Sequence, residues 1–212
     1  MWCPKRGDMM IGRAWGIVAL LAMQAGAAAA QDHLTNARAS FIFDGARVEI
    51  APNSPDAPVY AARFAALQPL CDPDCIAPEA AAVGVRTVIE PDVLGFLVNE
   101  VAQNQGLLVD ARMPGGRALG FIPGSVSLPH ETVASDNEFR DEILKALGAR
   151  AFESVFNFAD AQRLVVFDNG PSQNEASILI AHLLDACYPA EKINYYRGGM
   201  QVWSVVGLTV QE

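Results

Sequence analysis

The chain has 212 residues, of which 51% are hydrophobic and 18% are charged, a composition typical of a globular protein with one sizeable core. Its net charge of −9 would repel nucleic acid and anionic membrane surfaces, so we expect neither as a partner. The acidic balance by itself indicates a well-solvated surface.

Residues 1–30 have the order of a secretory signal. Lys5 and Arg6 precede an apolar run that starts at Trp15 and ends in small residues. This order predicts export to the periplasm and cleavage near Ala30, which would leave no segment inserted in the membrane. The alternative is an uncleaved anchor, but the run is short for a hydrocarbon layer roughly 30 Å thick.

Residues 31–86 form an N-terminal extension with two parts. In the first, the β-prone runs Phe41–Phe43 and Val48–Ile50 flank the turn dipeptide Asp44–Gly45, which predicts a hairpin. In the second, the segment 51–78 contains six prolines and few periodic apolar positions, so we expect an irregular arm that wraps the main domain. The extension is too small to hold a core alone.

Four cysteines bear on the redox state and on metal binding. Cys71 and Cys75 are close enough in sequence to bridge a tight loop, and an oxidising compartment permits a disulfide between them. Free thiols and a metal or redox pair are the alternatives. Cys187 falls late in an apolar helical pattern, where we expect a buried thiol. No histidine has a ligand spacing toward the cysteine pair, so we expect no metal, and no motif indicates a cofactor.

From Thr87 onward the pattern alternates between helices and strands. Helices are predicted where apolar residues share one face: Leu94, Leu97, Val98 and Val101; Phe139, Ile143 and Leu147 before Gly148; Ile178, Leu179, Leu183 and Ala186; and a short last helix from Gly198 through Trp203. Strands are predicted at 107–109, 125–128, 164–167 and 193–196. This alternation implies an α/β fold with a parallel sheet covered on both faces.

Three segments carry a resemblance to a known family. Leu107–Arg112 resembles a strand followed by Asp-x-Arg; Gly120–Ser125 resembles Gly-His-Ile-Pro-Gly-Ala with Phe121 in the histidine's place; Arg197–Met200, Trp203 and Gly207–Leu208 resemble a closing Gly-Gly, Trp and Gly-Leu-Pro-Val pattern. In this order, residues 87–210 resemble the rhodanese-like domain, to which we assign residues 87–212. The resemblance implies a central, mostly parallel five-stranded sheet with helices on both faces. Cys71–Ala77 and Asn169–Pro171 further resemble an exported bacterial branch with an N-terminal extension.

The resemblance also identifies where the family carries out its chemistry. The strand at 164–167 would deliver a cysteine into a loop whose backbone N–H groups stabilise a thiolate or persulfide. Here Asp168 holds that position, and a carboxylate cannot carry sulfur as a persulfide. The degenerate loop consists of Asp168, Asn169, Gly170, Pro171, Ser172, Gln173 and Asn174.

The charge of this loop is also unfavourable for an anionic sulfur donor. Asp168 and Glu175 are negative, and no lysine or arginine occurs from Asp168 through Ser177. We expect the Asp168 carboxylate to accept backbone N–H groups of the loop, and these bonds to lower its pKa. An ordinary exposed loop aspartate is the alternative.

Three more residues are expected to support the loop. Asp110 and Arg112 would hold a strand end and the neighbouring loop through an ion pair. Arg197, at another strand end, would either face the same mouth and attract an anion or lie stacked or solvated on the surface.

Together these observations predict a non-catalytic rhodanese-like protein: a periplasmic binding or accessory module, linked through its family to sulfur metabolism. Its partner would be an unidentified protein or a small anion, and no residue is assigned a catalytic role. One alternative is an active thiosulfate or persulfide sulfurtransferase, or a thiol redox protein, that uses Cys71 and Cys75. Another is a structural remnant without a ligand.

Overall fold

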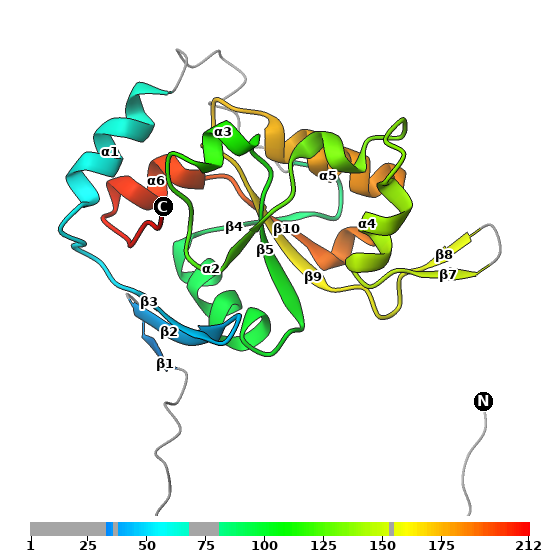
Figure 1. The fold of residues 1–212 in the computed structure, drawn as a ribbon, viewed down its shortest axis with the longest axis horizontal. Helices are drawn as coiled ribbons and strands as arrows, with labels where there is room; N and C mark the ends of the chain where they lie inside the picture. The colour runs from blue at the N-terminus through cyan, green and yellow to red at the C-terminus, as the bar shows by residue number, and fades with distance from the viewer. Residues whose placement is uncertain (1–32, 36–37, 68–80, 153–154) are drawn as a thin grey trace, which may run out of the picture. The chain divides into compact units, whose positions relative to one another are not determined.

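The computed structural model describes residues 33–35, 38–67, 81–152 and 155–212 (Figure 1). The predicted signal and the pair Cys71 and Cys75 lie outside these ranges, so export, cleavage and the disulfide stay predictions. Within the described ranges, no helix combines the length and the apolar character needed to cross a bilayer.

The N-terminal extension begins with a small antiparallel sheet. Its strands are β1 (His33–Thr35), β2 (Arg38–Phe43) and β3 (Ala46–Ile50), in that spatial order. Asp44 and Gly45 join β2 to β3 with φ values of 48° and 73°, the left-handed pair that a tight two-residue hairpin turn requires. The predicted hairpin is confirmed.

Helix α1 (Ala57–Ala66) occupies part of the arm that we expected to be irregular, so that expectation is wrong for these residues. Pro58 lies in the first helical turn, where a missing N–H costs nothing, and the residues after it are rich in alanine, a strong helix former. The proline therefore starts a helix instead of preventing one. Phe64 is fully buried, so α1 packs on the main domain, while residues 68–78 of the arm lie outside the described part of the chain.

The central sheet has five parallel strands, which confirms the predicted fold class. In spatial order they are β4 (Arg86–Val88), β10 (Ile193–Tyr196), β9 (Arg163–Phe167), β5 (Gly106–Asp110) and β6 (Ser125–Ser127). The last four coincide with predicted runs. The edge strand β4 was missed because it is three residues long and buries one of them, too short a segment to show alternation.

Helices cover both faces of this sheet (Figure 1). One face carries α1, the hairpin, α2 (Glu90–Phe96) with its continuation η2 (Leu97–Val101), and α6 (Gly199–Val205). The other face carries α4 (Arg140–Ala146) and α5 (Glu175–Asp185). The remaining elements are α3 (Pro114–Arg117), the 3-10 turns η3 (His130–Val133) and η4 (Ala190–Lys192), and the antiparallel strands β7 (Arg150–Phe152) and β8 (Val155–Asn157).

Two predicted helices differ in detail from the expectation. The apolar face of the first is buried as predicted, but its second half, η2, is a π-helical turn. In the second, Phe139 precedes α4 and is 59% exposed, whereas Leu144 fills the core. Gly148, with φ of 92°, ends that segment in the left-handed conformation that favours glycine.

Alternate residues of β9 enter the two cores. Val165 and Phe167 pack with α2 and α6, and Leu164 and Val166 pack with α4 and α5. A strand covered on both faces requires such an uninterrupted apolar run. Asp168, the next residue, therefore lies at the carboxyl edge of the sheet, directly after a strand that is buried on both faces.

Candidate functional site

The degenerate loop starts where β9 ends. Asp168 is fully buried, and its carboxylate accepts the Gly170 N–H through Oδ1 and the Ala176 N–H through Oδ2, each at 3.0 Å. Because Ala176 lies in the first turn of α5, the carboxylate sits at the positive end of a helix dipole. The expected N–H bonds are present, and the alternative of an exposed loop aspartate is wrong.

The expected direction of the Asp168 pKa is also wrong. Burial removes the carboxylate from water and raises its pKa to about 7, against the opposing effect of the N–H bonds from Ala176 and Gly170. The charge of Glu175 raises the pKa further, and Arg112 lowers it least. Since the loop brings no lysine or arginine against the carboxylate, burial outweighs the two hydrogen bonds, and Asp168 is partly protonated near neutral pH.

Asp110 and Arg112 form the ion pair expected at the end of β5. Arg112 Nε donates to Asp110 Oδ1 at 2.8 Å and Nη2 donates to Oδ2 at 2.6 Å, and both side chains are fully buried. Two parallel N–H···O bonds fix the orientation of the guanidinium as well as its position. Loss of Asp110 would leave the Arg112 charge buried without its carboxylate, and loss of Arg112 would leave Asp110 with Arg117 as its ion-pair partner in this cluster.

The other donors of Arg112 bind two further segments of the carboxyl edge, the one after β5 and the degenerate loop. Nη1 donates to Gly116 O at 3.0 Å and to Asn169 Oδ1 at 3.1 Å, and Nη2 donates to Gly120 O at 2.9 Å. With the two bonds to Asp110, all five guanidinium N–H groups have an acceptor. One arginine therefore joins β5, the segment after it and the degenerate loop.

Two residues of this cluster were not predicted as site residues. Arg117 donates to Asp110 Oδ2 at 3.0 Å, and its Cζ lies 3.9 Å from the ring centroid of Phe121. Phe64 of α1 contributes a ring 5.7 Å from Arg112 Cζ. The sequence offered little signal for either, because glycines separate Arg117 from Asp110 and Phe64 lies in the segment expected to be irregular.

The turn after β10 holds the loop from its other side. The Met200 N–H donates to Asp168 O at 3.0 Å, and the Gln201 N–H donates to Asn169 O at 2.9 Å. Gly199 has φ of 55°, and a Cβ there would lie 2.5 Å from Asp168 O. The close approach of two backbones therefore requires glycine at this position.

Arg197 follows β10 at the same edge of the sheet and is half buried. It lies two residues before Gly199, in the turn that supports the loop. Its role in attracting an anion stays a prediction.

The rest of the loop folds back on itself. The Gln173 N–H donates to Gly170 O at 2.9 Å, which closes a tight turn through Pro171 and Ser172. These two residues and Gln173 are half buried, and Asn174 is exposed. A loop whose N–H groups bind its own carboxylate and carbonyl has fewer to offer an incoming anion.

Cys187 is exposed, so the expected buried thiol is wrong. Helix α5 ends at Asp185, and Cys187 adopts a left-handed φ of 65° as the chain turns away. The N–H groups of Cys187 and Tyr188 donate to Leu184 O and Leu183 O, each at 2.9 Å, in a Schellman cap. Tyr188 takes the buried position after the helix. Among all described residues, no group of three or more His, Cys, Asp and Glu side chains is arranged to hold a metal ion.

These features define a class of protein: an α/β domain whose central parallel strand delivers a loop of inward-pointing N–H groups to the start of a helix. The family model of the rhodanese-like domain matches residues 96–205, more than half of the chain. The chain therefore belongs to the rhodanese-like domain family.

Several solved structures match the chain at low identity. A full-length protein from Lactobacillus plantarum is 18% identical, with 59% of this chain and 86% of that chain covered and a TM-score of 0.42. A thiosulfate sulfurtransferase from Pseudomonas aeruginosa is 17% identical, with 76% and 24% covered and a TM-score of 0.43. A human single-domain sulfurtransferase is 21% identical, with 56% and 95% covered and a TM-score of 0.35. Likeness at this level says nothing of activity. No curated protein matches the sequence.

Proposed function

We propose that this protein is a non-catalytic rhodanese-like domain that acts as a binding or accessory module. The observation that carries the proposal is the Asp168 carboxylate, which stands at the end of β9 and accepts the Gly170 and Ala176 N–H groups. Sulfur transfer from thiosulfate needs a thiolate that attacks the sulfane sulfur, forms a new S–S bond and expels sulfite with the electron pair of the broken bond. A carboxylate oxygen cannot hold sulfur in this way.

The charges around Asp168 support the same conclusion. Glu175, the first residue of α5, is half buried, so a dianionic donor would meet its carboxylate first and the buried, partly ionised Asp168 behind it. Arg112 has no N–H group left to donate to such an anion, because all five already have acceptors. The loop is therefore built to hold its own carboxyl group and not a sulfur anion.

An assay of thiocyanate formation from thiosulfate and cyanide tests the proposal. We expect the full chain to show no turnover above the buffer rate, and the double variant C71S/C75S to behave identically. Turnover that disappears in the double variant would overturn the proposal in favour of a sulfurtransferase or redox protein that uses Cys71 and Cys75. Turnover that persists in it would also overturn the proposal, and C187S would then identify or exclude the third thiol.

The substitution Asp168→Cys tests whether the cradle of N–H groups survives. The Gly170 and Ala176 N–H groups would stabilise a thiolate at this position, so we expect the variant to gain the mass of one sulfur atom after exposure to thiosulfate. Asp168→Ser, which lacks a thiol, is the matched control. An unmodified D168C protein would show that the surrounding loop, and not the nucleophile alone, has changed.

We further propose that the protein works in the periplasm, where it binds a protein or a small anion in a process linked to sulfur compounds. Support for the compartment comes from the basic, apolar and small-residue order of residues 1–30. Mass spectrometry of periplasmic extract should detect a chain that begins near Gln31; a full-length chain confined to the membrane fraction would contradict export. A periplasmic pull-down with no specific partner, together with no thermal shift by thiosulfate, sulfite or sulfate, would favour a structural remnant.

A further inference from the structure

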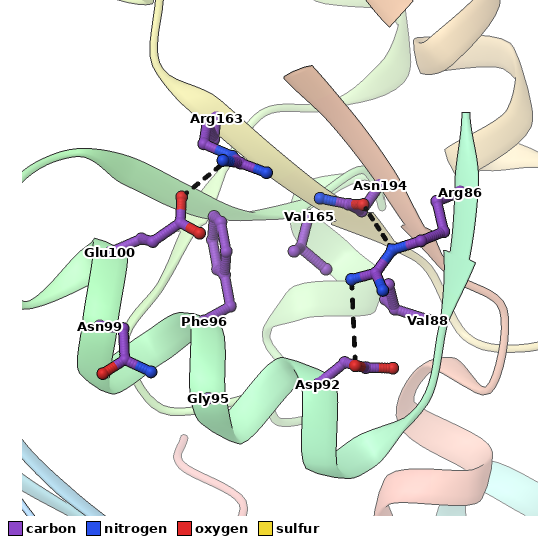
Figure 2. A pocket seen from close by; sticks show the side chains of 10 residues that line it. All are labelled: Arg86, Val88, Asp92, Gly95, Phe96, Asn99, Glu100, Arg163, Val165 and Asn194. Atoms are coloured by element: carbon purple, nitrogen blue, oxygen red, sulfur yellow. Dashed lines mark hydrogen bonds and ion pairs between the residues drawn. The ribbon is translucent and has the colours of Figure 1, made fainter. Parts of the chain in front are cut away.

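A polar cavity lies at the amino-terminal edge of the central sheet, the edge opposite Asp168. Its volume is about 110 Å³, it is open to solvent on one side, and it is lined by α2 with η2 and by strands β4, β9 and β10. Val88, Phe96 and Val165 supply its apolar surfaces, and Figure 2 shows polar side chains on either side of them. The cavity is thus separate from the degenerate loop, and no motif in the sequence pointed to it.

Each side of the cavity carries one guanidinium and one carboxylate (Figure 2). On one side, Arg163 Nε lies 3.2 Å from Glu100 Oε2. On the other side, Arg86 lies 3.9 Å from Asp92 Oδ1. The formal charges of these four residues cancel, although each wall presents both signs.

Glu100 offers a negative charge for a bound cation. Its Oε2 atom is buried, and the contact with Arg163 Nε is an ion pair that lacks hydrogen-bond alignment. Among the described residues, this oxygen accepts no hydrogen bond. Because Oε2 is closed off from the cavity, an ammonium group would be attracted by the charge of the Glu100 carboxylate, whose side chain is 25% exposed.

Arg86 offers donors for a bound anion. Its Nε reaches Asn194 Oδ1 at 3.4 Å, and its distance to Asp92 exceeds that of a hydrogen bond. The Arg86 side chain is 68% exposed, so it can turn toward a ligand without breaking a tight contact. A guanidinium fork matches a carboxylate with two parallel bonds.

We propose that this cavity binds a small zwitterion of amino-acid size, with its ammonium group at Glu100 and its carboxylate at Arg86. A water molecule takes at least about 10–15 Å³ of such a volume, so the cavity admits a compact molecule and excludes a nucleotide. A dianion would be attracted by the two arginines but repelled by the two carboxylates. A zwitterion would meet an opposite charge at each of its ends.

The backbone gives this proposal a second support. Glu100 and Asn99, which line the cavity, belong to the π-helical turn η2. Such turns are rare and occur frequently at functional sites, because the extra residue re-aims the side chains around it. Here the turn keeps Leu97 and Val101 in the core while it presents Asn99 and Glu100 to the cavity.

Calorimetric titration of the full chain with glycine, L-alanine and L-serine tests the proposal. We expect saturable binding in the millimolar range or tighter, and binding at least about tenfold weaker for N-acetylglycine and glycine methyl ester, each of which lacks one charge. Backbone amide shifts on titration should map to α2, η2 and β10. Absence of saturation with every zwitterion, tighter binding of sulfate, or shifts confined to the Asp168 loop would overturn the proposal.

The variants Arg86→Gln and Glu100→Gln each remove one of the two charges assigned to the ligand. We expect each to weaken glycine binding by at least about tenfold. Arg150→Gln is the matched control, because Arg150 forms an exposed ion pair with Asp160 on a hairpin away from the cavity. Equal affinity in all three variants would overturn the proposal, and unchanged thermal midpoints would show that the folds are intact.

Discussion

Arg112 donates to the side chain of Asn169 across 3.1 Å, and this bond ties the end of β5 to the loop that follows β9. The same guanidinium is held by Asp110 and by two backbone carbonyls, so the two strand ends and the segment between them form one connected unit. Asp168, which follows β9, is buried inside this unit. No donor of Arg112 is left for a ligand, so we assign it a structural role.

Removal of the Arg112 charge should destabilise the fold strongly. Arg112→Met leaves Asp110 buried with only Arg117 as an ion-pair partner in the described cluster, and we expect a loss of about 3 kcal/mol or more in the free energy of unfolding. Urea denaturation measures this loss. Arg150→Met, which breaks an exposed pair, should cost about 1 kcal/mol at most. Equal losses in the two variants would contradict the structural role of Arg112.

Asp168 should make stability depend on pH. The folded chain holds the Asp168 proton more tightly than the unfolded chain, because burial raises the pKa from 3.8 to about 7. Stability from this group is therefore full below about pH 4 and is lost as the pH rises to about 7, a change of about 4 kcal/mol at most.

Urea denaturation of the wild type and of Asp168→Asn, repeated across this pH range, measures the effect. The wild type should lose stability relative to D168N as the pH rises, whereas the exposed-site control Asp160→Asn should follow the wild type. A difference that grows in the opposite direction would indicate a lowered pKa for Asp168.

Gly199 should tolerate no side chain. A Cβ at this position would lie 2.5 Å from Asp168 O and 2.6 Å from Gly170 N, and φ is positive, so Gly199→Ala must displace the loop. We expect a loss of about 2 kcal/mol or more in the free energy of unfolding. Gly115→Ala, in α3 with no atom within 4 Å of its Cβ, should change stability by less than about 1 kcal/mol. Comparable effects at the two glycines would show that the backbones do not approach so closely.

Helix α1 should be an integral part of the domain. Phe64 is fully buried in the core shared with α2 and α6, so Phe64→Ala should cost about 3–5 kcal/mol. Val59→Ala, on the exposed side of the same helix, should stay within about 0.5 kcal/mol. Chemical denaturation gives both values. A small loss in F64A, with early proteolytic release of residues before 67, would instead describe a loosely attached helix.

The sequence was sufficient for the fold but not for the properties of the site. The run Leu164–Phe167 could be assigned to a buried parallel strand because every residue in it is apolar, and the place of Asp168 follows directly. The direction of its pKa could not be predicted, because the cost of burial depends on the depth of the loop and not on its residue types. Helix α1 was missed because prolines dominate its neighbourhood.

Contacts between residues far apart in the chain could not be predicted from the sequence for a different reason. Arg86 and Asn194 are 108 positions apart, and their meeting in the cavity depends on the pairing of β4 with β10. Arg117 likewise reaches Asp110 only because α3 folds back over the strand end. Periodicity reports which face of an element is buried, but it does not report which partners meet across the sheet.

The position of β10 also governs how the chain can fold as it leaves the ribosome. β10 is the last of the described strands in chain order, yet it lies between β4 and β9 and pairs with both. Until residue 196 has emerged, β4 has no partner in the sheet, and the nascent chain exposes two strand edges at once. A chain cut short before Ile193 would therefore lose the middle of its sheet and not its border, leaving β4 without a neighbouring strand.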